Sequence, residues 1–200
     1  MHEFIQTIFT FLVDLGYIGI ALALMIEVIP SEIVLAYAGY LVSRGEVSFV
    51  GAVIAGTIGG TIAQLFLYWM GLYGGRPFLD KYGKYLLIKK KHLDLSEEWF
   101  QKYGPGVIFT ARFIPVVRHA ISIPAGVAKM SWSKFTLYTV GAVIPWSIFF
   151  IFLGERLGSN WQKINEIAQP YLRPVIIGAI VAMLLYIGFH FYRRRKNGSV

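Results

Sequence analysis

Apolar residues fill most of this chain in long blocks that polar residues interrupt at only a few places. A transmembrane helix needs about 20 apolar residues, and several blocks reach about that length. They are residues 4–26, 47–73, 135–153 and 174–191. Two further apolar segments, 30–42 and 107–123, are too short or too interrupted by charge for a simple crossing. The pattern predicts an all-α membrane protein with about four full transmembrane helices.

The two short apolar segments combine prolines with charged residues. The first begins at Pro30, and the second contains Arg112, Pro115 and Arg118. A proline removes a helical hydrogen bond, and the freed carbonyl inside a membrane needs a partner from protein or water. We therefore expect both segments to be re-entrant, each entering the membrane and returning to the same side. A simple kink in an ordinary span is the alternative.

The residues around the two short segments follow the same order. A charged residue stands three positions before a proline at Glu27 and at Arg112, and an Ala-Gly pair follows, ending at Gly39 and Gly126. Proline-interrupted segments at matching positions of two repeats point to a transporter site. We predict one polytopic membrane domain over residues 1–200, built as an inverted repeat with two opposed re-entrant helical hairpins. Its parts are repeat one (about 10–75), an amphipathic segment (76–103), repeat two (about 104–158) and a final transmembrane helix (171–192).

Basic residues gather in segment 76–103 and near the C-terminus, and they give the chain a net charge of +8. Both clusters flank apolar blocks, and an excess of Lys and Arg marks the cytoplasmic side of a membrane. Four spans then place both termini in the cytoplasm. Aromatic residues among the basic ones of 76–103 favour interfacial amphipathic helices over a plain loop. We expect a multi-pass protein of a bacterial cytoplasmic membrane, with no nucleic acid as partner.

Four charged residues in or beside the short segments are the candidates for chemistry: Glu27, Glu32, Arg112 and Arg118. A charge at the bilayer centre costs about 2.5–3.5 kcal/mol on insertion scales, so such groups pair or line a wet cavity. The planar guanidinium fork suits phosphate, which makes the two arginines a candidate anion clamp. Carboxyl groups in a low dielectric readily take up protons, so the two glutamates are candidates for proton coupling. Buried salt bridges that only lock the segments are the structural alternative.

Two neighbours of these charges join the candidate site. Ser31, beside Glu32, is a further candidate for phosphate binding. His119 follows Arg118 and is either a third phosphate donor or a proton relay, although a lone histidine more often serves packing or hydrogen bonding. No spacing of His, Asp and Glu matches a metal site, and no dinucleotide or phosphate-loop fingerprint is present. We expect neither metal nor cofactor.

The segment from Arg112 to Gly126, Arg-Phe-Ile-Pro-Val-Val-Arg-His-Ala-Ile-Ser-Ile-Pro-Ala-Gly, resembles the most specific motif of the DedA family of bacterial membrane proteins. Glu27 before Pro30 resembles the family's first motif, although the second proline of many members is missing here. The resemblance covers about residues 16–158. It implies opposed re-entrant hairpins, a functional set of two glutamates and two arginines, dependence on the proton-motive force, and lipid transport. It is strongest to the members linked to undecaprenyl phosphate.

We therefore predict a protein that flips a phosphate-bearing lipid, with undecaprenyl phosphate as the substrate that the resemblance implies. Phosphatidylethanolamine or another phospholipid is an alternative substrate. A proton-coupled cation or drug antiporter is a different class, and the two arginines argue against it because they repel cations. A membrane phosphatase needs a motif that the chain lacks, so we predict no enzyme. A non-catalytic scaffold and a homodimer stay open.

Overall fold

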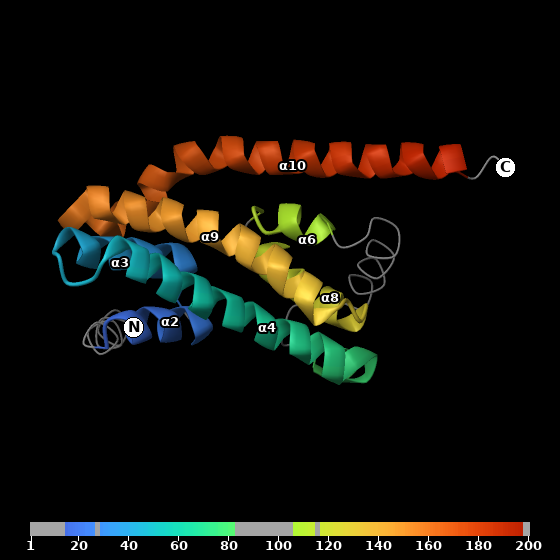
Figure 1. Cartoon of the computed structure of the whole chain (residues 1–200), viewed down its shortest axis with the longest axis horizontal. Helices are drawn as coiled ribbons and strands as arrows, with labels where there is room; N and C mark the ends of the chain where they lie inside the picture. The colour runs from blue at the N-terminus through green and yellow to red at the C-terminus, as the bar shows by residue number, and fades with distance from the viewer. Residues whose placement is uncertain (1–14, 27–28, 83–105, 115–116, 198–200) are drawn as a thin grey trace. The chain divides into compact units, whose positions relative to one another are not determined.

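The structure is a computed structural model that describes residues 15–26, 29–82, 106–114 and 117–197. Throughout these ranges the regular elements are helices and no strand occurs, which confirms the all-α prediction. In chain order they are α2 (Tyr17–Ile26), α3 (Ser31–Ser43), α4 (Phe49–Tyr82), α6 (Gly106–Ala111), α7 (Val117–Ala120), α8 (Ser122–Val127), α9 (Trp132–Leu157), the 3₁₀-helix η1 (Gly158–Lys163) and α10 (Ile164–Asn197) (Figure 1). Glu27, Pro115 and residues 83–103 of the predicted amphipathic segment lie outside the described residues.

Two of the predicted spans fall on helices that are long and apolar enough to cross a membrane. They are Phe49–Gly74, of 26 residues, and Trp132–Lys163, of 32 residues. At 1.5 Å per residue the shorter one extends about 39 Å, more than the ~30 Å of a bilayer's hydrocarbon core. Of the other two predicted spans, 4–26 begins outside the described residues, and 174–191 lies within α10.

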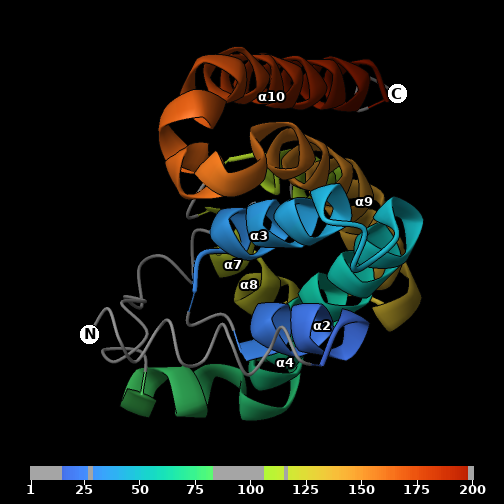
Figure 2. The same ribbon diagram turned by 90° about the vertical axis from the view of Figure 1, so that its left-hand side faces the viewer.

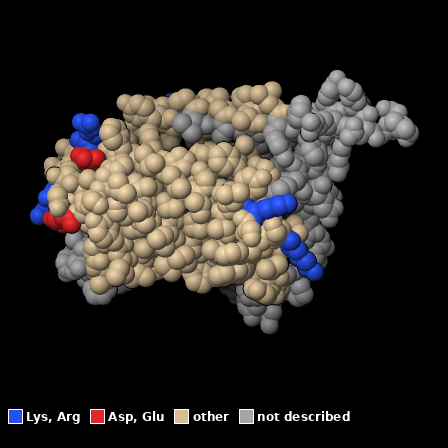
Figure 3. All heavy atoms as spheres, in the orientation of Figure 1, with Lys and Arg blue, Asp and Glu red and all other residues tan. Residues whose placement is uncertain are grey.

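Large apolar side chains are exposed along these helices. On α4 and α9 they include Ile54, Ile58, Phe66, Leu137 and Phe152. On the face that Figure 3 shows, most described atoms belong to uncharged residues, and the visible charged side chains lie at the edges of that surface. An apolar exterior is costly in water and suits contact with lipid tails, as expected for a membrane protein.

The chain divides into two compact units, and α4 and α9 contribute to both. Unit 1 comprises residues 1–63 and 140–171, and unit 2 comprises residues 64–139 and 172–200. Unit 1 holds α2, α3, η1 and the later part of α9, with Leu35, Ala36 and Phe150 among its buried side chains. Tyr37 of α3 meets Trp161 of η1 edge to face, with ring centroids 4.8 Å apart.

In unit 1, α3 packs on α9 through two facing glycines. A Cβ on Gly39 would collide with the carbonyl oxygen of Ile151, and a Cβ on Gly154 would collide with that of Ala36. The backbones of α3 and α9 can approach this closely because neither Gly39 nor Gly154 has a Cβ. Gly39, predicted as a hairpin glycine, lies in this contact.

Unit 2 holds the later part of α4, the short helices α6, α7 and α8, and the first turns of α9. Its core cluster consists of Leu65, Tyr68, Ile108, Ala125 and Phe135. The rings of Tyr68 and Phe135 stack with centroids 4.5 Å apart. Figure 2 shows α7 and α8 next to each other, in agreement with their contacts.

In unit 2, α8 packs on α4 through a second pair of facing glycines. A Cβ on Gly126 would collide with the carbonyl oxygen of Tyr68, and a Cβ on Gly71 would collide with that of Ile123. This contact has the same form as the contact between Gly39 and its partner helix in unit 1. The two glycines that the sequence assigns to the hairpins thus make equivalent backbone contacts, each in its own unit.

Two local features differ from the simplest sequence expectation. The α4 helix continues through Gly74 and the following glycine to Tyr82, so it does not end where the apolar block ends. The second short segment is divided into α6, α7 and α8, and its described break falls between Ala111 and Val117. Pro115 falls in this interval of the sequence, and a proline disfavours a continuous helix through the residues before it.

Candidate functional site

Arg112 directly follows α6 and is the most deeply buried of the described polar site candidates, with 5% of its surface exposed. Its backbone N–H still donates to the carbonyl oxygen of Ile108 at 3.2 Å, so the side chain leaves the last turn of α6. The guanidinium carbon lies 5.3 Å from the ring centroid of Phe135, within range of a cation–π interaction. The side chain therefore extends into the core of unit 2.

The guanidinium of Arg112 donates to oxygens from four parts of unit 2. Nη1 donates to Gln64 Oε1 and to the carbonyl oxygen of Arg118, each at 3.1 Å. Nη2 donates to Thr139 Oγ1 at 2.8 Å and to Ser122 Oγ at 3.3 Å. These four acceptors are uncharged, so dipoles of the protein solvate the cation in these contacts. We call Arg112 with these four residues the arginine cluster.

Gln64 joins the arginine cluster to His119. Its Oε1 accepts from Arg112 and also from Ser122 Oγ at 2.7 Å. Its Nε2 lies 3.0 Å from Nδ1 of His119. Gln64 comes from the middle of α4, where only 3% of its surface is exposed. One amide thus contacts three side chains that are 48 to 58 residues away in the sequence.

The structure brings three predicted site residues together in unit 2. Arg118 and His119 are half-buried on α7, and the described link between Arg112 and Arg118 runs through the carbonyl oxygen of Arg118. Ser31 and Glu32 form the first turn of α3 in unit 1. An acidic side chain at that position is favoured by the partial positive charge of the helix N-terminus.

The remaining predicted site residues are the prolines and glycines expected to shape the backbone of the two hairpins. Pro30 precedes α3 with φ −52° and ψ 130°, an extended conformation that the helix cannot use, so it marks the start of α3. Gly39 and Gly126 make the close contacts described above. Glu27 and Pro115 lie outside the described residues.

Sequence reasoning missed Gln64, Ser122 and Thr139. Each is a single polar residue inside an apolar stretch, and such residues are common in membrane helices. The signal that identifies Gln64 is its uncharged amide in the middle of a block otherwise suited to a full span, since an amide in hydrocarbon needs partners. Ser122 and Thr139 become identifiable only when their distance to Arg112 is known.

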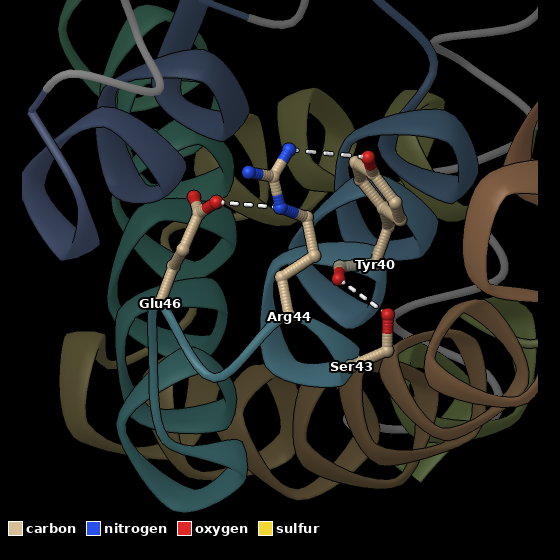
Figure 4. A network of polar contacts seen from close by, with 4 residues as sticks. All are labelled: Tyr40, Ser43, Arg44 and Glu46. Carbon is tan, nitrogen blue, oxygen red and sulfur yellow. Dashed lines mark hydrogen bonds and ion pairs between the residues drawn. The ribbon is translucent and has the colours of Figure 1, made fainter.

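A second polar network lies at the turn between α3 and α4 in unit 1 (Figure 4). Arg44 donates to the hydroxyl oxygen of Tyr40 at 3.3 Å and pairs with Glu46 at 2.7 Å, while Ser43 Oγ donates to the carbonyl oxygen of Tyr40. The hydrogen bond to Tyr40, followed by the charge of Glu46, raises the pKa of Arg44 above its ordinary value. These side chains are largely exposed, so the network is a cap on the turn that contributes little to stability.

Among the described residues, no group of three or more His, Asp or Glu could hold a metal ion. The family model described as the VTT domain matches residues 29–156. That range includes α3, the arginine cluster and both glycine contacts. The chain belongs to the VTT-domain, or DedA, family. The resemblance seen around Arg112 is thereby confirmed.

Relatives of this VTT-domain protein include several bacterial membrane proteins. It is 64% identical to undecaprenyl phosphate transporter A of Bacillus subtilis, over 93% of this chain and 94% of the relative. It is 38% identical to an alkaline phosphatase-like protein of Lactococcus lactis, over 92% of each. It is 32% identical to undecaprenyl phosphate transporter A of Staphylococcus aureus, over 96% of this chain and 98% of the relative. No solved structure matches the chain significantly.

Proposed function

We propose that this VTT-domain protein moves a phosphate-bearing lipid between the leaflets of the cytoplasmic membrane, and that the lipid is undecaprenyl phosphate. Two of its relatives carry the name undecaprenyl phosphate transporter A, one of them at 64% identity over most of both chains. The observation that carries the proposal is the arginine cluster, which keeps a permanently charged guanidinium in the interior of a helical, apolar protein.

The four described acceptors of Arg112 suit exchange for a phosphate. Hydroxyl and carbonyl oxygens are weaker acceptors for a guanidinium than a phosphate anion. A phosphate that takes the Nη2 position replaces Ser122 Oγ and Thr139 Oγ1 as acceptor. Both hydroxyls also donate within the protein, to Gln64 and to Phe135, so they keep a partner after the exchange. The cluster is therefore an anion site that protein groups occupy when no lipid is bound.

The other candidate residues take complementary roles in this proposal. Arg118 and His119, in the same unit as Arg112, add donors to the lipid phosphate, and Ser31 of unit 1 is a separate candidate for phosphate binding. Glu27 and Glu32 carry the protons that couple transport to the proton-motive force. The equivalent glycine contacts in the two units support two related hairpins in an inverted repeat, with Pro30 and Pro115 interrupting their helices. Both termini lie in the cytoplasm, next to the basic segments.

Transport by purified protein in liposomes containing undecaprenyl phosphate tests the proposal. An added soluble phosphatase that reaches only the outer leaflet reports how fast the lipid phosphate arrives there. We expect Arg112→Met to lower the rate at least about tenfold, because the charge-assisted bonds to phosphate are lost. Arg112→Lys keeps the charge but loses the planar fork, and we expect it to be intermediate.

Arg44→Gln is the matched control, because Arg44 is an exposed arginine whose contacts stay within one turn. Size-exclusion profiles and helical content establish that each variant is folded. Wild-type rates in folded Arg112→Met would contradict the proposal. Faster movement of phosphatidylethanolamine than of undecaprenyl phosphate would favour the alternative substrate, and release of inorganic phosphate by the protein alone would favour a phosphatase.

A further inference from the structure

Gln64 has the central position in the arginine cluster, and the functional roles proposed above leave it unused. It is nine-tenths buried or more, and its two polar atoms contact Arg112, Ser122 and His119. It belongs to α4, whereas His119 belongs to α7 and Arg112 follows α6. One side chain therefore connects three helical elements of unit 2.

The orientation of the Gln64 amide follows from the chemistry of its neighbours. A guanidinium can only donate hydrogen bonds, so the atom that faces Arg112 has to be the carbonyl oxygen Oε1. Ser122 Oγ, at 2.7 Å from the same oxygen, is a donor there as well. The amide nitrogen Nε2 then faces Nδ1 of His119 at 3.0 Å, and it donates because an amide nitrogen does not accept.

This orientation determines the state of His119 in the structure. Its Nδ1 accepts the hydrogen bond from Gln64, so the ring is neutral and carries its hydrogen on Nε2. A protonated ring has a hydrogen on both nitrogens and would present a second donor to Nε2 of Gln64. Rotation of the amide does not remove this conflict, because its nitrogen would then face the donors of Arg112. No orientation of Gln64 satisfies both a protonated His119 and Arg112.

We infer that Gln64 is a positioning residue that couples protonation of His119 to release of Arg112 for the lipid phosphate. With neutral His119, the amide holds Nη1 of Arg112 through Oε1. When a proton from the aqueous phase binds Nδ1 of His119, the amide is displaced. The Nη1 hydrogen that it accepted is then donated to a phosphate oxygen, while the bond from Nη1 to the carbonyl oxygen of Arg118 stays in place. Loss of the proton to the aqueous phase restores the first state. This inference rests on the proposed transport of a phosphate-bearing lipid.

The elements around His119 in unit 2 carry cations, phenols and one carboxylate. These side chains are Arg112, Arg118, Tyr68, Tyr73, Lys134 and Tyr138, with Lys129 in the turn after α8 and Arg76, Asp80, Lys81 and Tyr82 near the end of α4. α8, which contacts α7, carries no titratable side chain. Histidine as a residue type changes its charge between pH about 5 and 8, whereas arginine, lysine, tyrosine and aspartate change theirs outside that range.

Two substitutions of Gln64 show whether it links His119 to Arg112 or only fills space in unit 2. Gln64→Met keeps the length of the side chain and removes its hydrogen bonds to Arg112, Ser122 and His119, so protonation of His119 no longer affects Arg112. Gln64→Glu provides a carboxylate that accepts from Arg112 and from a protonated His119 at once, so Arg112 stays held in both states. Thr136→Val is the control, since the Thr136 hydroxyl in the same unit has no hydrogen-bond partner among the described residues.

The link between Gln64 and His119 is measured without lipid transport, by ¹⁵N NMR of histidine-labelled protein in nanodiscs. His119 is assigned from the signals that disappear in His119→Gln. We expect a neutral ring with the hydrogen on Nε2 and a hydrogen-bonded Nδ1, and loss of the Nδ1 bond in Gln64→Met. A neutral ring with its hydrogen on Nδ1 would overturn the inference.

Coupling is measured as the rate of undecaprenyl phosphate transport in liposomes between pH about 5 and 8. We expect the wild-type rate to rise about tenfold toward low pH, the effect of one charge-assisted hydrogen bond. Gln64→Met and His119→Gln lose this dependence, Gln64→Glu is slow throughout, and Thr136→Val follows the wild type. Titration of the lipid itself is common to all variants and cancels in the comparison.

A wild-type pH profile in Gln64→Met would overturn the coupling. If the wild type moves no lipid at any pH, the proposed function fails, and the NMR measurement still decides whether Gln64 responds to the state of His119.

Discussion

At the scale of single residues, the Arg112 guanidinium lies inside unit 2 and donates to four described oxygens that carry no net charge. Transfer of a charged group from water to a protein interior costs several kcal/mol, and each hydrogen bond to a charged group returns about 1.5–3 kcal/mol. The four described bonds and the ring of Phe135 therefore offset much of this cost. The side-chain acceptors among them can be tested by a substitution that removes the oxygen and keeps the shape of the side chain.

Thr139→Val removes the acceptor that lies 2.8 Å from Nη2 of Arg112 and leaves the volume unchanged. We expect the free energy of unfolding in detergent to fall by about 1–3 kcal/mol, because a buried charged donor loses a partner. Thr136→Val makes the same change one turn earlier in α9, where the hydroxyl has no described partner, and should stay within about 0.5 kcal/mol of the wild type. Equal losses in the two variants would show that Thr139 does not solvate Arg112.

At the scale of elements, facing glycines bring helices together in each unit. Gly56 and Gly60 of α4 have the four-residue spacing typical of close helix packing, but a Cβ on them would meet side chains of Leu35 and Val143 at 2.9 and 3.2 Å. The backbone-to-backbone contacts involve other glycines, such as Gly126 of α8 against α4. A four-residue spacing of small residues predicts that two helices pack closely. Which glycine lies in the contact depends on the position of the partner helix.

Gly126→Ala should destabilise unit 2, because the new Cβ would meet the carbonyl oxygen of Tyr68 and the helices would have to separate. We expect a loss of about 1–3 kcal/mol in the free energy of unfolding, the usual cost of overpacking. Gly178→Ala in α10 is the matched control, since nothing lies within 4 Å of its Cβ position. Alanine should there be neutral or stabilise by up to about 1 kcal/mol. A neutral Gly126→Ala would disprove the close contact.

The elements differ in how well their sequences predict them. α4 and α9 follow from apolar length alone, because about 20 apolar residues are needed to cross a membrane and both blocks have them. The site is only partly predictable. Arg112 stands out because a charge in an apolar segment is costly, whereas Gln64 and Thr139 are unremarkable until the fold places them beside it. Their role depends on contacts across 27 to 48 residues, which no local pattern encodes.

At the scale of the whole molecule, the chain is a helical membrane protein of the VTT-domain family. Each of its two units contains a helix from one of the short apolar segments, packed through glycine on part of a long helix. Only unit 2 contains the arginine cluster, while unit 1 contributes Ser31 and Glu32. The proposed roles therefore differ between the units, with the guanidinium of Arg112 for phosphate in unit 2 and the carboxyl group of Glu32 for protons in unit 1.

The central claim is that Arg112 binds the phosphate of a lipid. Native mass spectrometry tests this claim most directly. The protein is released from membranes in mild detergent, and the mass of the lipid that stays bound is measured. We predict that undecaprenyl phosphate remains on the wild type and on Arg44→Gln, and that folded Arg112→Met has lost it. Undecaprenyl phosphate bound equally to Arg112→Met, or its absence from the wild type while other lipids stay bound, would contradict the account.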